Sequence, residues 1–318
     1  MYNLIASYVP ILLIMIISFF LSSFLHLQDK NKIINYFLKV RVFLSGGFFY
    51  FFIFLYYYDN LNLVIFIFMT LMFLVGILDD RFDLKISLRF LSTFSLILIF
   101  LILDNTYITY FNFLSSPNLI LNTILTITFL LGFLHMTNMS DGKNGHLMTY
   151  VLFILYFSLY KIGFDEIDYF IFILLSSSIF FLLLNLLNLC QLGNSGVIIL
   201  SLIIYFIIKD NYDLNYMSEI DIFVLFSFLI FDGIRVSFLR IKNKKSPFSK
   251  DLLHMHFLFK KWHLGYFVIF FNYSLLLLIF INIDLKFYID FLLCLFFYIN
   301  VLFLSKLLNN NNFFNLKL

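Results

Sequence analysis

The sequence predicts an all-α integral membrane protein with about 11 transmembrane helices. Hydrophobic residues make up 63% of the chain, and its mean hydropathy is +1.00. Apolar runs of membrane-crossing length also recur from end to end, separated by short polar breaks. Some of these runs are shorter than about 17 residues, so their boundaries are approximate. We expect helices over residues 4–25, 42–58, 61–78, 86–103, 118–137, 146–160, 167–185, 195–208, 220–239, 265–283 and 286–305.

The basic residues indicate how the chain is oriented in the membrane. When the polar breaks are numbered along the chain, the odd breaks and the tail hold 18 of the 21 Lys and Arg residues, whereas the even breaks hold only Lys161, Lys209 and Lys286. The positive-inside rule then places the odd breaks and the C-terminus in the cytoplasm, and the N-terminus outside. We expect one polytopic domain over residues 1–318. Its cytoplasmic loops fall near 26–41, 79–85, 138–145, 186–194 and 240–264.

The acidic residues are distributed differently from the basic ones. Eleven of the 18 acids lie on the outer side or at its helix ends, and the cytoplasmic side holds the other seven. Several of these seven fall in tight clusters, which general solvation of loops does not explain. We therefore expect the active site on the cytoplasmic loops. The seven acids are Asp29, Asp79, Asp80, Asp83, Asp141, Asp232 and Asp251.

The densest cluster follows the third apolar run. Asp79 and Asp80 are adjacent, and Asp83 follows within one helical turn. Carboxylates at this spacing repel one another unless they share a cation, and hard oxygen ligands suit Mg²⁺ together with a diphosphate. The alternative is a solvated helix end, but acids are otherwise scarce at the cytoplasmic boundaries. The cluster therefore favours a functional site.

Two glycine-containing turns follow later apolar runs. The first, NMSDGKNG at 138–145, includes Asn138 and Asp141, and the second is LGNSG at 192–196. Asp-Gly and Asn-Gly pairs form tight turns, so each segment has a purely structural interpretation. Glycines also let a backbone approach a phosphate closely, and a helix that opens after such a turn directs N–H groups at anions. Neither motif decides between these interpretations by itself.

The long loop after the ninth run holds the remaining candidates. Asp232 and Arg235 lie near the end of that run, and SPFSKDLLHMHF occupies 246–257. On an extended segment, His254 and His256 project to the same side, an arrangement suited to a metal or a phosphate. The alternative is a pair of surface histidines in a basic stretch that contacts anionic lipid.

Taken together, these four segments resemble the polyprenyl-phosphate N-acetylhexosamine-1-phosphate transferases, which are glycosyltransferase family 4. LDDRFD at 78–83 is similar to the aspartate-rich motif of the undecaprenyl-phosphate GlcNAc-1-phosphate branch. The segments at 138–145, 192–196 and 246–257 resemble N-x-x-D-G-x-D-G, F-x-G-D-x-G-S and S-P-F-x-P-D-R-x-H-I-H-H, and Asp232 with Arg235 matches D-x-x-R. QDKNK at 28–32 and the Gly46-Gly47 pair resemble the family's first loop. The resemblance spans nearly the whole chain.

The resemblance implies a reaction at the cytoplasmic face of the bacterial inner membrane. An N-acetylhexosamine-1-phosphate, GlcNAc-1-phosphate first among the candidates, would pass from a UDP-sugar to undecaprenyl phosphate. UMP would leave, and a cell-envelope polysaccharide such as O-antigen would begin. The implied cofactor is Mg²⁺ or Mn²⁺, nucleic acid is not an expected partner, and a homodimer is one compatible assembly. The implied residues are Asp79, Asp80, Asp83 and Asp141 for catalysis, Asp141 and Asn194 for the metal, and Asn138, Asp232, Arg235, His254 and His256 for substrate.

The chain departs from the family pattern at several positions. The family has Asp where this chain has Asn144 and Asn194, and the second of these would weaken metal binding because an amide lacks the formal charge. Leu252 replaces an Arg, and Phe257 replaces the last His. Two other functions therefore stay open. One is a catalytically altered or inactive family member that binds lipid or nucleotide. The other is a transporter. A transporter would need charged side chains at mid-membrane depth, whereas the acids of this chain cluster at helix boundaries and in loops.

Overall fold

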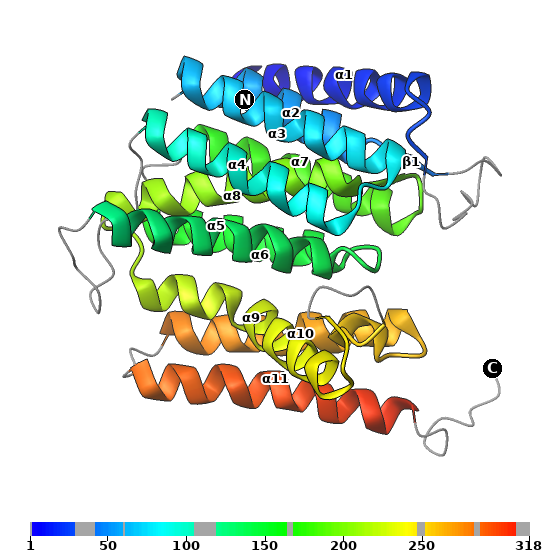
Figure 1. Cartoon of the computed structure of the whole chain (residues 1–318), viewed down its shortest axis with the longest axis vertical. Coiled ribbons are helices and arrows are strands. Elements are labelled where there is room, and N and C mark those ends of the chain that lie inside the picture. Colours follow the sequence, from blue (N-terminus) through cyan, green and yellow to red (C-terminus); the bar gives the residue numbers. More distant parts are fainter. Residues whose placement is uncertain are drawn as a thin grey trace. The chain divides into compact units, whose positions relative to one another are not determined.

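A computed structural model describes residues 2–28, 42–59, 61–104, 119–163, 168–246, 252–282 and 287–309. Over these residues the chain forms eleven α-helices, two two-residue strands and one short 3₁₀ helix (Figure 1). The all-α membrane class predicted from the sequence is confirmed. The elements are α1 (Tyr2–Phe24), β1 (Phe43–Leu44), α2 (Gly46–Tyr57), α3 (Leu63–Phe82), α4 (Ile86–Asp104), α5 (Leu119–Ser140), α6 (His146–Ile162), α7 (Tyr169–Leu186), β2 (Cys190–Gln191), α8 (Gly193–Asp213), α9 (Glu219–Lys242), η1 (Met255–Phe257), α10 (Trp262–Asn282) and α11 (Phe287–Asn309).

Most of these helices have the length and composition of membrane spans. Within the described ranges, eight helices qualify, namely α3, α4, α5, α7, α8, α9, α10 and α11. Shorter apolar helices cover Val9–Phe24, Gly46–Tyr57 and His146–Ile162. The chain is thus a multi-pass membrane protein. The eleven crossings and the orientation with the N-terminus outside stay predictions.

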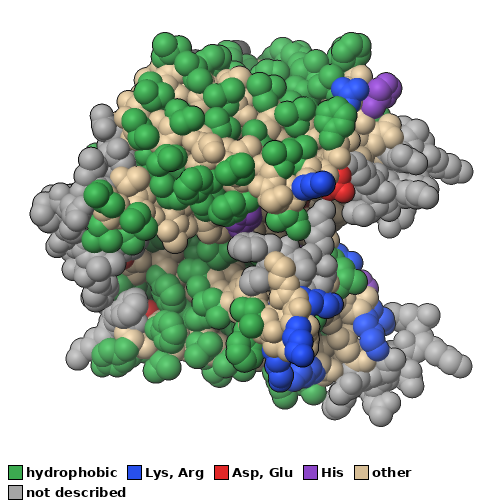
Figure 2. Space-filling view, in the orientation of Figure 1, with side chains coloured by type: hydrophobic (Ala, Val, Ile, Leu, Met, Phe, Trp, Pro, Cys, Tyr) green, Lys and Arg blue, Asp and Glu red, His purple; other side chains and the backbone are tan. Residues whose placement is uncertain are grey.

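The surface of the helices suits a lipid environment. Large apolar side chains such as Phe20, Phe238 and Phe303 are exposed, which is favourable against acyl chains and unusual against water. On the face drawn in Figure 2, hydrophobic side chains cover the helices, whereas Lys and Arg side chains gather over the end of α9. Lys242, Lys244 and Lys245 are exposed there.

The chain forms two compact units. Unit 1 comprises Met1–Asn138 and Tyr150–Met217, and unit 2 comprises Met139–Thr149 and Ser218–Leu318. In unit 1, α8 packs against both α2 and α3 and is buried along most of its length. In unit 2, α11 packs against both α9 and α10. The prediction of a single transferase domain is not decided by this division and stays a prediction.

Polar side chains set the starts of several helices. The Asn62 side chain accepts a hydrogen bond from the backbone N–H of Ile65 at the start of α3. Asp168 accepts two such bonds at the start of α7, and Ser218 begins α9 with a capping box. These side chains satisfy N–H groups that the first turn of a helix leaves without a partner.

Two features bring the end of α3 against the start of α8. β1 pairs in parallel with β2, immediately before α2 and α8 begin. A Cβ atom on Gly76 of α3 would overlap the Cα of Ser195, so only glycine permits this approach of the two helices. The packing places the adjacent carboxylates of Asp79 and Asp80 beside the first turn of α8.

Candidate functional site

Asp79 is a buried ion-pair partner at the end of α3. Its Oδ2 lies 2.8 Å from Nη1 of Arg89 on α4, and its Oδ1 accepts a hydrogen bond from the backbone N–H of Leu84 at 2.9 Å. The Asp79 side chain is only 1% exposed, whereas that of Arg89 is 16% exposed. The pair closes the turn between α3 and α4 and neutralises a carboxylate that water does not reach.

Asp80 sits against the N-terminus of α8. Its Oδ1 accepts a bond from the Asn194 N–H at 2.6 Å, and its Oδ2 accepts from both the N–H and the hydroxyl of Ser195, at 3.1 and 2.6 Å. A helix N-terminus favours negative charge, so this carboxylate takes the place of the phosphate that the LGNSG motif suggested. Gly193 has φ +70°, and a Cβ there would lie 2.8 Å from Oδ2 of Asp80.

Asp83 differs from its two neighbours. It is exposed, it ends α3 in the left-handed conformation with φ 53°, and its N–H donates to the carbonyl of Asp79. Protein donors, namely Arg89 and the first turn of α8, relieve the repulsion between Asp79 and Asp80. The catalytic roles predicted for the three aspartates stay predictions.

Asn138 and Asn194 meet within unit 1. The Asn138 amide nitrogen donates to Oδ1 of Asn194 at 3.3 Å, and both side chains are partly exposed. About two turns into α8, the Ser201 hydroxyl donates to Oγ1 of Thr137 at 2.7 Å. These two bonds hold the end of α5 along α8. They also bring together two residues that the sequence placed in separate motifs.

Asp141 belongs to unit 2, in the turn between α5 and α6. The turn is fixed by its neighbours: His146 Nδ1 lies 2.8 Å from the carbonyl oxygen of Ser140, and the Trp262 indole N–H donates to the carbonyl of Asn144 at 3.0 Å. Asp141 is partly exposed. Its predicted roles in catalysis and metal binding stay predictions.

Asp232 is the centre of a polar network in unit 2. Its carboxylate accepts hydrogen bonds from four donors: Nη2 of Arg235, the hydroxyl of Tyr298, Nδ1 of His254 and the backbone N–H of Met255. A carboxylate so fully occupied organises its surroundings and has little capacity left for substrate. We therefore interpret Asp232 as the residue that fixes the segment carrying the two histidines.

His254 is held at both ring nitrogens. Nδ1 lies 2.9 Å from Oδ2 of Asp232, and Nε2 lies 3.3 Å from Nη2 of Arg240, a buried residue. Because a guanidinium only donates, Nε2 accepts and Nδ1 carries the proton. The ring is thus fixed in one tautomer, between a cation and an anion of the same helix.

His256 has the opposite environment. It is 1% exposed, and neither ring nitrogen has a hydrogen-bond partner among the described residues. Its ring is parallel to that of His254 at a centroid distance of 5.9 Å, and it contacts the rings of His146 and Phe257. Two unsatisfied buried nitrogens are costly, and such groups are retained at functional positions. Met255–Phe257 forms a 3₁₀ helix, not the extended segment expected from the sequence.

Gly142 makes the close packing around His256 possible. A Cβ at this position would overlap Nε2 of His256 and lie 2.6 Å from Cζ of Phe257. We expect Gly142→Ala to displace η1 and lower the free energy of unfolding of unit 2 by about 2 kcal/mol. Trp262 is the only tryptophan of the chain, and its indole ring lies 6.4 Å from the His256 ring. Its fluorescence therefore reports this change directly.

Gly132→Ala is the matched control for that substitution. A Cβ on Gly132 would meet only the Met136 methyl at 3.8 Å, an ordinary contact, and alanine is the better helix former. Its Trp262 emission and unfolding midpoint should match or exceed those of the natural chain. Equal stability of the two variants would contradict the packing described for Gly142.

The environment of His256 also predicts a pH dependence. Burial and the nearby His146, His254 and Lys143 lower its pKa well below the ordinary 6.5, against the opposing effect of Asp232. Below pH 6.5 His256 is protonated in the unfolded chain but stays neutral in the folded chain. The contribution of His256 to stability is therefore fully present above pH 6.5 and is lost as the pH falls. The loss for one such group approaches about 1.4 kcal/mol per pH unit.

This dependence is measured from the unfolding midpoint of the Trp262 signal at pH 7.5 and pH 5.5. We expect His256→Leu to reduce the difference between the two midpoints. His263→Leu, which removes an exposed histidine of the same unit, should leave the difference unchanged. The interpretation of His256 is wrong if both variants respond alike.

Four residues of these networks were not among the predicted site residues. Arg89 and Arg240 count toward the positive-inside bias, and nothing in their spacing distinguishes a buried pair from a solvated charge. Tyr298 and Trp262 are aromatic residues in a chain rich in them. The sequence carries one usable signal: Arg235 and Arg240 lie three and eight residues after Asp232, which is about one and two helical turns along the same helix.

Some predicted positions lie outside the described residues. These are 29–41, which hold most of the expected first loop, and Pro247–Asp251 in the long loop. Leu252, which replaces a family Arg, is exposed. Nothing further follows for these segments.

The described residues contain no group of three or more His, Cys, Asp or Glu side chains that could hold a metal ion. Mg²⁺ is commonly bound through one or two carboxylates together with substrate phosphates and water. Oxygen donors of that kind are present at Asp141 in unit 2 and at Asn194 in unit 1. The metal-binding roles of both residues stay predictions.

Comparison with known families identifies the central part of the chain. Residues 62–208 match the family described as glycosyl transferase family 4. This stretch, a little under half of the chain, is similar to that family. A comparison with curated proteins finds no match.

The glycosyl transferase family 4 stretch runs from the residue before α3 to the last turns of α8. It contains Asp79, Asp80, Asn138, Asp141 and Asn194. The resemblance stated from the sequence motifs is therefore confirmed for residues 62–208, which are similar to a family of glycosyl transferases. The Asp232 network, His254 and His256 lie beyond the matched residues. Of the two features that suggested the GlcNAc-1-phosphate branch, LDDRFD at 78–83 lies within the match and the loop at 246–257 lies beyond it.

Proposed function

We propose that this protein transfers an N-acetylhexosamine-1-phosphate, most simply GlcNAc-1-phosphate, from a UDP-sugar to undecaprenyl phosphate. The observation that carries the proposal is the match of residues 62–208 to glycosyl transferase family 4 in a multi-pass membrane protein. A membrane enzyme suits the reaction because the polyprenyl acceptor does not leave the bilayer. The product would begin a cell-envelope polysaccharide.

In the proposed reaction, an oxygen of the acceptor phosphate attacks the sugar-linked β-phosphorus of the nucleotide sugar. The bond from that phosphorus to the bridging oxygen breaks, and UMP leaves. Phosphoryl transfer asks a protein mainly for positioning and for charge stabilisation. Arg235 and His256 are the residues of unit 2 best suited to bind substrate. Arg235 keeps one guanidinium nitrogen, Nη1, without a partner among the described residues, and His256 keeps both of its ring nitrogens.

Asp79, Asp80 and Asp83 are proposed to act at the acceptor phosphate. The ion pair with Arg89 keeps Asp79 at a defined place, and Asp80 keeps the first turn of α8 in register with it. We propose Mg²⁺ as the cofactor, with Mn²⁺ as a substitute. When bound, it would neutralise the diphosphate charge. Asp141 and Asn194 are the proposed protein ligands.

A second function has one observation in its favour. Asn194 stands where the family has an aspartate, and its Oδ1 accepts the amide proton of Asn138. A catalytically altered member that binds lipid or nucleotide would tolerate this arrangement, because binding does not require the lost charge. The two functions differ in one measurable property, which is turnover.

The deciding experiment uses membranes that contain the full chain. They are incubated with undecaprenyl phosphate, Mg²⁺ and a panel of UDP-N-acetylhexosamines labelled in the sugar. Label in the organic phase and released UMP are counted with and without EDTA. We expect transfer that needs the metal and that Asp141→Asn abolishes, whereas Asp59→Asn, at an exposed position on the opposite side of the predicted topology, leaves it unchanged.

The absence of transfer from every sugar, with the natural chain folded, would favour the catalytically altered member. In that case the Asn144→Asp and Asn194→Asp double variant is assayed in the same way. Recovery of transfer would show that the two asparagines cause the loss of activity. If the double variant also transfers no sugar, the proposed reaction is excluded for this chain.

A further inference from the structure

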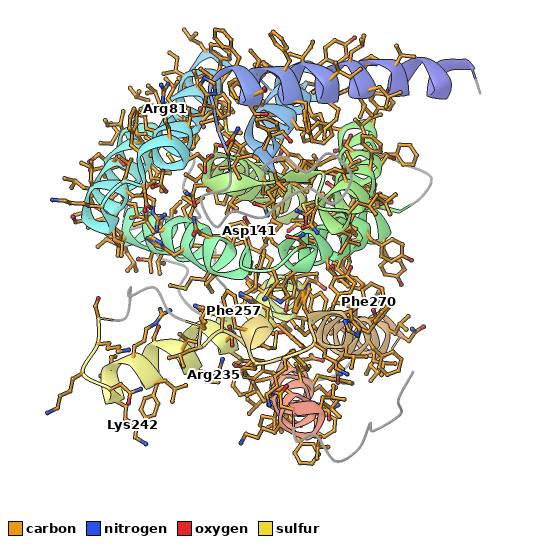
Figure 3. The ribbon with its side chains drawn as sticks, turned by 90° about the vertical axis from the view of Figure 1, so that its right-hand side faces the viewer. Arg81, Asp141, Arg235, Lys242, Phe257 and Phe270 are labelled. Atoms are coloured by element: carbon orange, nitrogen blue, oxygen red, sulfur yellow. The ribbon has the colours of Figure 1, made fainter. Side chains whose placement is uncertain are left out.

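Arg235 is held by a closed ring of hydrogen bonds between α9 and α11. Its Nε donates to the hydroxyl of Tyr298 at 2.7 Å, and its Nη2 donates to Oδ1 of Asp232 at 2.7 Å. The Tyr298 hydroxyl in turn donates to the same Oδ1 at 3.1 Å. Nη2 also donates to the carbonyl of Leu253 at 2.6 Å. Two of the three guanidinium nitrogens, Nε and Nη2, are thus fixed by hydrogen bonds (Figure 3 labels Arg235).

Tyr298 is the most buried member of this ring. Its side chain is 4% exposed, and its aromatic ring contacts those of Phe228 and Phe231 at centroid distances of 6.1 and 5.8 Å. A buried tyrosine hydroxyl needs a partner, and here it both accepts and donates. Because the ring cannot turn away, the hydroxyl fixes the plane of the Arg235 guanidinium.

One edge of the guanidinium remains available. Nη1 has no hydrogen-bond partner among the described residues, and the Arg235 side chain is 21% exposed. An arginine whose other nitrogens are already fixed loses little conformational entropy when it binds an anion. The planar fork is also the protein group best matched to phosphate oxygens.

We infer that Tyr298 is a positioning residue that presents the Nη1 edge of Arg235 to the diphosphate of the nucleotide sugar. Asp232 shares this task, but its substitution would also release His254 and Met255, so Tyr298 gives the cleaner test. The nature of the anion rests on the proposed function. The positioning itself rests on the hydrogen bonds of Tyr298 alone.

Tyr298→Phe removes the hydroxyl and keeps the packed ring. Tyr273→Phe is its matched control, because Tyr273 is also buried, its ring also contacts Phe228, and its hydroxyl donates to the carbonyl of Leu225 away from Arg235. Tyr298→Phe loses the two hydrogen bonds of its hydroxyl and Tyr273→Phe loses the bond to Leu225, so both variants should lose stability. Only Tyr298→Phe should alter Arg235.

The first readout is independent of catalysis. The chain has five arginines, and ¹⁵N labelling of arginine in detergent micelles, with Arg235→Lys for assignment, isolates the Nε–H signal of Arg235. We expect its exchange with water to accelerate in Tyr298→Phe and to stay slow in Tyr273→Phe. Titration with UDP and with inorganic pyrophosphate should shift this signal. The Kd should be about tenfold higher in Tyr298→Phe, as expected for one hydrogen bond to a charged group.

The second readout is transfer itself. We expect Tyr298→Phe to raise the KM for the UDP-sugar by about tenfold with little change in kcat, because the lost interaction acts on ground state and transition state alike. An unchanged Kd, or a natural chain whose Arg235 signal responds to neither UDP nor pyrophosphate, would overturn the inference. A natural chain that binds both probes yet transfers no sugar would overturn the proposed function and leave the positioning role supported.

Discussion

Asp80→Asn is expected to lower the free energy of unfolding by about 3 kcal/mol. The Asp80 carboxylate accepts three hydrogen bonds from Asn194 and Ser195 at the start of α8. An asparagine has one acceptor oxygen and directs an NH₂ group at the remaining donors. Each lost bond to a charged acceptor in a buried place removes about 1.5 kcal/mol or more, and the favourable charge at the helix N-terminus is lost as well.

Cys190 provides a local measure of this effect. It lies in β2, immediately before α8, and its thiol is fully buried. If the first turn of α8 loosens, a maleimide should label Cys190 faster in Asp80→Asn than in the natural chain. Cys294, which is buried in unit 2, serves as an internal reference because its labelling should not change. Mass spectrometry of the peptides distinguishes the two cysteines.

Asp213→Asn is the control for the charge change. Asp213 lies at the other end of α8 and forms an exposed ion pair with Lys209 at 2.6 Å. Such pairs contribute between about 0 and 1 kcal/mol, so both stability and Cys190 labelling should stay close to natural values. If Asp80→Asn behaves like Asp213→Asn, the carboxylate does not anchor α8.

The helices were predictable from sequence because lipid imposes a simple requirement. A chain that crosses the bilayer must satisfy its backbone polar groups within each segment, so long apolar runs become helices. The start of α2 was less predictable. The apolar run begins at 42, yet the helix begins at Gly46, because Phe43 and Leu44 pair with Cys190 and Gln191. That pairing joins residues almost 150 positions apart, and no local pattern announces it.

The candidate site was also predictable only in part. The sequence located Asp79 and Asp80, because adjacent carboxylates at a membrane boundary are unusual. It did not reveal what neutralises them, since one partner is Arg89 on the next helix and the other is the first turn of α8, more than 110 positions away. The argument for a shared cation assumed that repulsion had no other relief. The folded chain supplies that relief with its own donors.

The two histidines illustrate a further limit. Their spacing on an extended segment predicted rings on one side. The segment is instead a 3₁₀ helix, in which the two rings are parallel with an interplanar angle of 4°. Their chemistry is nevertheless unlike. His254 is tied to Asp232 and Arg240, whereas His256 has no partner at either nitrogen among the described residues. Residues that look equivalent in a motif therefore differ in what they offer a ligand, and this difference depends on tertiary packing alone.

Arg89→Leu is expected to lower the free energy of unfolding by about 3 kcal/mol and to abolish any transfer activity. Without Arg89, the Asp79 carboxylate stays buried, and among the described residues it keeps only the Leu84 N–H as a partner. Removing one member of a buried ion pair costs about 3 to 5 kcal/mol, because it leaves the other charge uncompensated. The partial exposure of Arg89 places the expected value at the lower end. Lys85→Leu, at an exposed position of the same turn, should have little effect.

A double-mutant cycle separates the ion pair from the packing of the two side chains. Asp79→Asn removes the buried charge, so the Asp79→Asn and Arg89→Leu double variant should be more stable than the sum of the two single losses predicts, by at least about 1 kcal/mol. Denaturant unfolding in detergent micelles gives all four free energies. Strict additivity would mean that the two side chains do not interact in the folded protein. If the double variant recovers stability but not transfer, then the charge of Asp79 is needed for the reaction and not only for the turn between α3 and α4.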